Sequence, residues 1–157
     1  MRKRVTREHA WHDSVADRNW LDLSQLAQVE VTSEDLAHPI DAALLPAAGS
    51  GWRAAQPGEQ IIRLLFDEPQ QVSCIQLLFH EDKQARTQEF LLRCLQDKHQ
   101  SYREIVRQQH HFSPPGTIRE LEEYAVDLAD VLVLELKIVP DITGGAAHAS
   151  IVRFRVG

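Results

Sequence analysis

Short apolar runs separated by turn residues are the feature that most limits how this chain can fold. Eight such runs occupy residues 27–32, 60–66, 72–79, 88–94, 102–106, 123–128, 131–139 and 149–156. Turn-forming residues lie between them, for example Pro57-Gly58 and Pro140-Asp141. Alternation of apolar and polar residues is typical of half-buried β-strands. We therefore predict an all-β fold, an eight-stranded antiparallel jelly-roll β-sandwich.

The alternation also predicts the core, since every second residue of a strand points to the same face. The predicted core consists of Ile62, Leu64, Phe66, Ile75, Leu77, Phe79, Phe90, Leu92, Cys94, Leu132, Leu134, Leu136, Ile138, Val152, Phe154 and Val156. Cys94 is in phase with the inward residues of its run, whereas Cys74 is out of phase with those of its own. We therefore expect no disulfide between the two cysteines.

Two segments fit the strand pattern less well. Residues 117–129 begin with Thr117-Ile118-Arg119-Glu120, which has the spacing of a helix capping box, and apolar residues follow at helical intervals. The same segment also fits a strand with Tyr124 on one face, so helix and strand both stay open. Residues 34–45 are compatible with a short helical turn that Pro39 interrupts.

Size and charge limit the domain organisation and the partners. The chain has 157 residues, 43% of them hydrophobic, and we expect an N-terminal arm over residues 1–22 and a single sandwich domain over residues 23–157. The net charge of −6 argues against binding to duplex DNA or to an anionic membrane. No apolar run approaches the ~18 residues of a membrane span. Because no apolar run follows the basic start either, we expect a cytoplasmic protein.

The order of motifs along the chain resembles a known family. The segment GWRAAQPGEQIIRLLFDEPQQVSCI (51–75) contains a tryptophan, a Pro-Gly turn, a strand that ends in an acidic turn, and a Val-x-x-Ile strand. A basic residue before a strand (Arg86), a hairpin turn with Asp97 and a closing pair of strands follow. Over residues 27–156 this succession resembles the discoidin, or coagulation-factor C-type, branch of the galactose-binding-domain-like family.

The resemblance implies a jelly-roll sandwich that binds glycans, phospholipid head groups or proteins through loops at one end. Members that hold a structural calcium usually place an Asp-Gly pair shortly before the tryptophan. This chain has Leu45-Pro46 at that position. Calcium needs several oxygen ligands, so we expect neither a calcium site nor any other cofactor.

Each strand of such a sandwich runs from one end to the other, so successive loops alternate between the two ends. One end collects residues 33–59, 80–87, 107–122 and 140–148, and the other collects 67–71, 95–101 and 129–130. The first end has the longer loops and five of the eight histidines. Loops on a rigid scaffold commonly carry function, so we expect the binding site at this end.

The candidate ligand-binding residues at this end combine planar, charged and hydrogen-bonding side chains. They are His38, Trp52, His80, Glu81, Arg86, Gln109, His110 and His111. Arg86 offers a planar fork that suits a carboxylate, a phosphate or a pair of sugar hydroxyls. The alternative is structural: Arg86 caps the acidic turn at Glu81, the histidines are solvated, and Trp52 packs beneath a loop instead of stacking on a sugar.

The sequence contains no G-x-S-x-G, Gly-rich phosphate loop or H-E-x-x-H motif, and the histidine spacing matches no metal signature. We therefore expect a non-catalytic binding module without a native metal. Its ligand is a small polar molecule or a glycan. The alternative is a protein-interaction module that uses the same rim or a sheet face with Arg93 and Arg103, including as a homo-oligomer. Nucleic acid is not expected, since the basic residues are spread among acidic ones.

Overall fold

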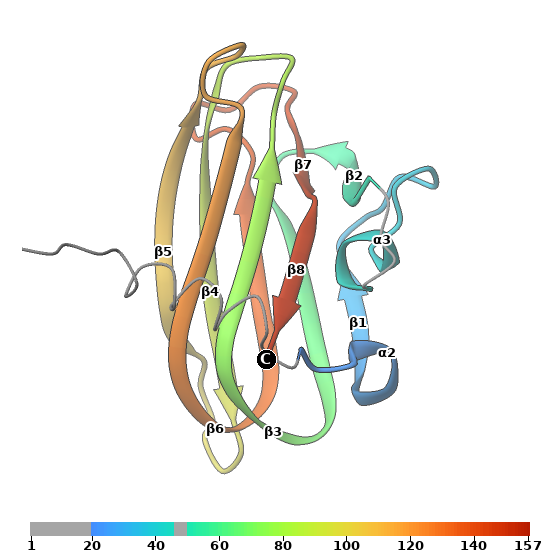
Figure 1. The fold of residues 1–157 in the computed structure, drawn as a ribbon, viewed down its shortest axis with the longest axis vertical. Helices are drawn as coiled ribbons and strands as arrows, with labels where there is room; N and C mark the ends of the chain where they lie inside the picture. Colours follow the sequence, from blue (N-terminus) through green and yellow to red (C-terminus); the bar gives the residue numbers. More distant parts are fainter. Residues whose placement is uncertain (1–19, 46–49) are drawn as a thin grey trace, which may run out of the picture.

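Two long strands organise the fold. The computed structural model describes residues 20–45 and 50–157, and in it β3 (Gln60–His80) and β6 (Arg119–Val139) are 21 residues each. The first half of β3 pairs with the second half of β6, and the second half of β3 pairs with the first half of β6. Both strands bend where the register shifts, between the two halves. Each of them therefore contains two of the predicted strands and contributes to both layers of the sandwich (Figure 1).

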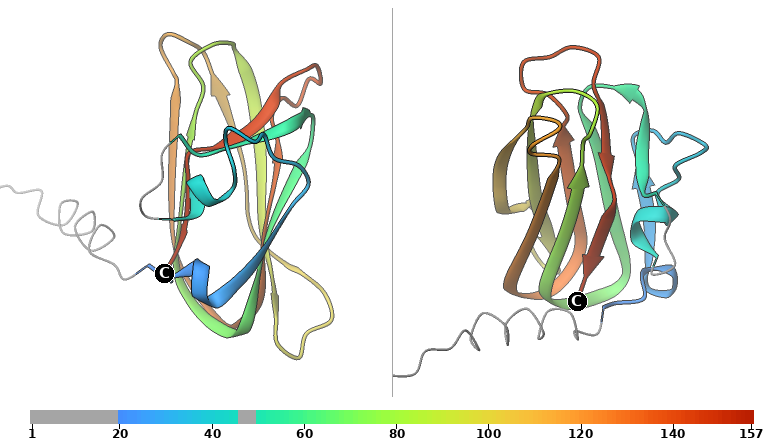
Figure 2. Two further views of the ribbon diagram at one scale, coloured as in Figure 1. Left: turned by 90° about the vertical axis from the view of Figure 1, so that its right-hand side faces the viewer. Right: turned by 45° about the horizontal axis from the view of Figure 1, so that its top comes forward.

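The larger layer has five strands, which are β1 (Ala27–Val31), the first half of β3, the second half of β6, β4 (Arg86–Gln96) and β5 (Arg103–Phe112). The smaller layer has the first half of β6, the second half of β3 and β8 (Arg153–Val156). Five and three strands give the eight of the predicted antiparallel sandwich, so the fold class is confirmed. A separate pair, β2 (Trp52–Pro57) and β7 (His148–Ile151), lies beside the smaller layer (Figure 2).

The open question at residues 117–129 is decided in favour of a strand, because β6 begins at Arg119 and pairs with β3 along its whole first half. The helical spacing there is overridden by this pairing. The predicted short helical turn in residues 34–45 is confirmed as α3 (Asp41–Leu44). A second turn, α2 (Leu23–Leu26), was not predicted, and the side chain of Asp22 caps it by accepting a hydrogen bond from the backbone N–H of Ser24.

The predicted core residues are buried between the layers, with two exceptions. Leu132 is half-buried because Gln96 pairs with Val131, which leaves Leu132 as the extra residue of a β-bulge. Val152 is half-buried because it lies at the break between β7 and β8. Val131 and Ile151 are buried instead. Both cysteines are buried, and burial raises the pKa of the Cys94 thiol.

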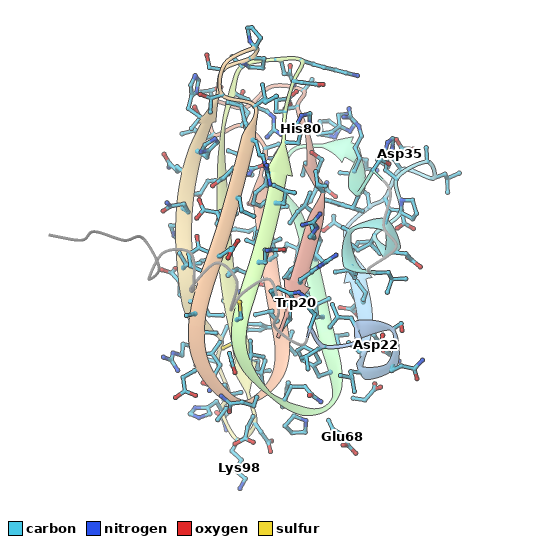
Figure 3. The ribbon with its side chains drawn as sticks, in the orientation of Figure 1. Trp20, Asp22, Asp35, Glu68, His80 and Lys98 are labelled. Atoms are coloured by element: carbon cyan, nitrogen blue, oxygen red, sulfur yellow. The ribbon has the colours of Figure 1, made fainter. Side chains whose placement is uncertain are left out.

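The two ends of the sandwich differ in their connections. Figure 3 places His80 near one end and places Glu68 and Lys98 at the other, where the turns of β3, β6 and the β4–β5 hairpin lie. The predicted arm is only partly described, and there the backbone N–H of Leu21 donates to the carbonyl of Val156. The boundary at residue 22 therefore stays a prediction. Within the described ranges, the helices are too short and polar to span a bilayer.

Candidate functional site

A cavity of about 230 Å³ opens at the end of the sandwich where His80 lies. It is bounded by the end of β3 and the loop that follows, by the start of β2, and by β7 and the residue after it. The residues that line it are His38, Ser50, Trp52, Arg53, His80, Glu81, Asp82, Lys83, His148, Ser150, Ile151 and Val152. Segments that are far apart in the sequence thus bring three histidines to one cavity.

Gly51 and Trp52, which follow Ser50 along one side of the cavity, are both held closely by their neighbours. Gly51 has a φ of 85°, and a Cβ built on it would lie 2.5 Å from the carbonyl oxygen of Ile151, so no other residue fits there without displacement. Trp52 is only 1% exposed, and its Nε1 donates to the carbonyl of Ser33 at 3.1 Å. Because the indole is buried, Trp52 is a packing residue beneath the loop, as the structural alternative predicted, and its ring is not open for stacking on a sugar.

The hydrogen bonds of two cavity histidines define their tautomers. His148 Nδ1 lies 3.0 Å from the carbonyl oxygen of Ala54, and His38 Nδ1 lies 3.3 Å from Asp35 Oδ2. The pKa of Asp35 is lowered by the backbone N–H of Ala37 and by His38, so its carboxylate is ionised and accepts. Nδ1 must therefore carry the proton in both rings. In the neutral ring Nε2 then has a lone pair that can accept a hydrogen bond from a ligand.

Four other side chains of the cavity make no direct contact of this kind with the described residues. Arg53, His80, Asp82 and Lys83 are exposed and make no side-chain hydrogen bond or ion pair within the described parts of the chain. Together with the two Nε2 atoms they provide donors and acceptors of both charge signs. The cavity can therefore bind a hydroxylated ligand by hydrogen bonds from several directions.

Glu81 lines the cavity, but its carboxylate is occupied. Its oxygens accept hydrogen bonds from Arg86 Nε at 2.7 Å and from the backbone N–H groups of Lys83 and Gln84 at 2.9 and 3.3 Å. Burial acts to raise the pKa of Glu81, but the bonds from Arg86 and Lys83 outweigh it and lower the pKa. Glu81 thus holds the loop after β3 in place, and its carboxylate oxygens are already engaged in hydrogen bonds within the protein.

The prediction that Arg86 presents a fork to a ligand is wrong. Arg86 is 3% exposed. Its Nη1 donates to the carbonyl of Pro140 at 2.8 Å and to Gln88 Oε1 at 3.2 Å, and its guanidinium lies 4.8 Å from the centroid of the Phe112 ring. The structural alternative is correct, since Arg86 caps the turn at Glu81 by donating a hydrogen bond to the Glu81 carboxylate.

The three candidates on β5 do not line the cavity. Gln109 pairs with Glu89 and His111 with Thr87 on the outer face of the five-stranded layer, where Gln109 Nε2 donates to Glu89 Oε1. His110 lies on the inner face, where burial lowers its pKa and its ring lies 4.7 Å from that of Phe112. The structure thus brings together His38, Trp52, His80 and Glu81 but separates Gln109, His110 and His111 from them.

A pair of neighbouring carboxyl groups, the buried Glu120 and the half-buried Glu122, was missed in the sequence. Glu120 is 4% exposed, and its Oε1 accepts a hydrogen bond from Gln88 Nε2 at 3.3 Å. Burial, together with a hydrogen bond to Glu122 and its negative charge, raises the pKa of Glu120 to about 8. The i, i+2 spacing of two acids on a strand was the available signal, but it was hidden by the apparent capping box. Glu81, Arg86, Gln88 and Glu120 form one hydrogen-bonded chain from the cavity wall to the interior.

The described residues include no cluster of metal ligands. In the described part of the chain, no three His, Cys, Asp or Glu side chains are grouped closely enough to hold a metal ion. Leu45, at the position of the family's calcium-binding pair, is half-buried next to α3, and Pro46 lies outside the described residues.

Comparison with known proteins gives the fold. No family model and no curated protein matches this sequence. Among solved structures, a fucosidase from Ruminococcus gnavus in complex with fucose superposes over 95% of this chain with a TM-score of 0.67 and 8% identity. A mutant of the same enzyme superposes with a TM-score of 0.68, and in both cases the superposition covers 28% of the fucosidase chain. The chain thus corresponds to a fraction of that enzyme.

Carbohydrate-binding modules match over nearly their whole length. The family 32 module of AlyQ, in complex with 4,5-unsaturated mannuronic acid, is 15% identical, with a TM-score of 0.59 over 89% of this chain and 98% of the module. The family 32 module of NanJ from C. perfringens, in complex with galactose, is 13% identical, with a TM-score of 0.59 over 87% of this chain and 96% of the module. This chain therefore has the same β-sandwich fold as these modules.

Proposed function

We propose that this chain is a non-catalytic module that binds a glycan or another small polar ligand in the cavity lined by His38, His80 and His148. The observation that carries the proposal is the convergence of unpaired polar groups on one cavity at the loop-rich end of the sandwich. Pockets with a few convergent polar groups are the usual form of small-molecule sites. The structural similarity to modules whose bound ligands are sugars supports the same class of ligand.

The chemistry of the cavity fits sugar hydroxyl groups. Nε2 of His38 and of His148 accepts hydrogen bonds in the neutral ring, and a hydroxyl group donates them. Ser50 and Ser150 add hydroxyls that donate and accept. Among the described residues, no hydrogen bond joins Ser50 or Ser150 to a histidine of the cavity, so neither hydroxyl has an activating base in place, and this supports binding without catalysis.

The test uses His148, because two substitutions separate its ring nitrogens. Asparagine places its amide near the position of Nδ1 and keeps the bond to Ala54, whereas glutamine extends to the position of Nε2. We expect His148→Asn to weaken binding of galactose or fucose at least tenfold in calorimetric titration, while His148→Gln retains more of it. His99→Asn, at an exposed position of the opposite end, is the matched control.

Binding that is unchanged in His148→Asn would contradict the cavity as the site. Failure of the wild-type protein to bind any mono- or oligosaccharide, with capture of a protein partner, would replace the proposal by the protein-interaction alternative.

We further propose that the chain belongs to the discoidin branch of the galactose-binding-like fold, supported by the order of motifs around Trp52 and Arg86. The cytoplasmic location stays a prediction, which cell fractionation tests.

A further inference from the structure

The cavity contains two cationic side chains whose hydrogen-bond donors are not used by any of the described residues. Arg53 and Lys83 both line it, both are exposed, and neither makes an ion pair in the described ranges of the chain. An arginine with a free guanidinium presents a planar set of donors that matches a carboxylate, and lysine adds a mobile charge. These two side chains are therefore available to an anionic group of a ligand.

The carboxylates near the cavity do not occupy these donors. Glu81 is paired with Arg86, which lies just behind the cavity wall. Asp35, whose pKa is lowered in part by the charge of Arg53, is bonded to the backbone N–H of Ala37 and to His38. Asp82 lines the cavity and, within the described residues, makes no ion pair with Arg53 or Lys83. The hydrogen-bond donors of both cations are thus open to an anionic group of a ligand.

The polar groups of the cavity are also of two kinds. Arg53 and Lys83 donate hydrogen bonds with positive charge, whereas Nε2 of His38 and of His148 accepts them in the neutral ring. A neutral sugar satisfies the acceptors but leaves both cations without a partner. A sugar that carries an acid group satisfies both sets.

We propose that the ligand of this cavity is an anionic sugar, whose acid group binds Arg53 and Lys83 and whose hydroxyl groups donate to His38 and His148. This inference rests on the proposed function and specifies its ligand class. A uronate and a sugar phosphate share the required chemistry, and the experiment distinguishes them.

The test compares four ligands that differ in the acid group alone, by calorimetric titration of the wild-type chain at pH 7.5. They are galacturonate, its methyl ester, galactose 6-phosphate and galactose. We expect at least one of the two acids to bind tenfold or more tightly than galactose, and the methyl ester to bind like galactose. The better acid identifies the anionic group, and its affinity should fall with added salt because the attraction is electrostatic.

Two variants locate the anion. We expect Arg53→Gln and Lys83→Gln each to weaken binding of the preferred acid fivefold or more, and to weaken galactose binding by a clearly smaller factor. Arg103→Gln is the control, because Arg103 is exposed and begins β5 at the opposite end.

Equal affinity for galactose and both acids would overturn the anionic ligand class, while the proposed sugar-binding function would stand. Tighter binding of an acid that both variants leave unchanged would overturn the assignment to Arg53 and Lys83. Absence of binding by all four ligands and by their oligosaccharides would overturn the proposed function and this inference together.

Discussion

The cavity and the buried chain beneath it contain the same kinds of side chain and use them in opposite ways. In the cavity, Arg53 and Asp82 are exposed and have no hydrogen bond or ion pair in the described residues. In the buried chain, Arg86 and Glu120 are nearly inaccessible and bond to neighbouring side chains. A buried polar group without a hydrogen-bond partner costs free energy of folding, so buried polar groups are paired. Exposed polar groups are solvated by water and stay available to a ligand. Burial therefore separates structural from ligand-binding polar residues here.

The largest effect is expected from Arg86→Ala. This change leaves Glu81 Oε1 and the carbonyl of Pro140 without the donor that Arg86 provides, and removal of one partner of a buried ion pair costs about 3–5 kcal/mol. We expect a loss of that size in the free energy of unfolding, measured with urea. Arg53→Ala is the matched control and should change it by less than about 0.5 kcal/mol. Equal small effects of the two would show that the distinction between cavity and buried chain is not energetic.

A smaller loss is expected from Gly51→Ala, which tests the close packing of Gly51 beside the cavity. A non-glycine residue at positive φ costs roughly 1–3 kcal/mol, and here the Cβ also meets the Ile151 carbonyl at 2.5 Å. Gly58→Ala separates the two causes, because Gly58 has a φ of 87° and nothing within 4 Å of its added Cβ. Thermal unfolding should show a clearly larger loss for Gly51→Ala. Similar losses would mean that the contact with β7 does not matter.

The protonation of Glu120 gives stability a pH dependence. Its pKa is raised from 4.5 to about 8 in the folded protein. Below about pH 4.5 both states hold the proton, and as the pH rises to about 8 the folded state loses stability relative to the unfolded one. Arg86, His110, Glu122 and Tyr124 are the titratable groups that face it or lie next in the network.

Glu120→Gln keeps an acceptor for Gln88 and removes the titration. We expect wild type to lose on the order of 2 kcal/mol more than this variant between pH 5 and pH 8, measured by urea unfolding. Parallel pH profiles of the two proteins would show that Glu120 is ionised throughout this range. Asp82→Asn, in the exposed cavity, should not alter the profile.

The smallest effect is expected from His111→Ala. His111 is exposed on the outer face of the five-stranded layer, and its one side-chain hydrogen bond is with Thr87. We expect a change within about 0.5 kcal/mol in stability and none in ligand affinity. A loss of sugar binding in this variant would extend the site beyond the cavity to β5.

The amino-acid sequence alone determined the fold class. Alternation of apolar and polar residues is a local pattern that can be recognised within a single strand. The inward faces of β3, β4 and β8 could therefore be predicted from it. The order of motifs pointed to the same sandwich. The exceptions were local irregularities. The bulge at Leu132 and the break at Val152 shift the phase by one residue, and no composition signal marked either of them.

Only the tertiary structure decided which polar residues can bind. The sequence placed Arg86, Trp52 and His80 in the same group of loops, but it does not show which of these side chains is buried. The packing of the two layers brings Gln88 of β4 to Glu120 of β6, and the pairing of β2 with β7 sets Trp52 opposite Ile151. The same packing brings His148 and His80 to one cavity. Burial depends on contacts between residues distant in the chain, so it follows from the packed sheets and not from local pattern.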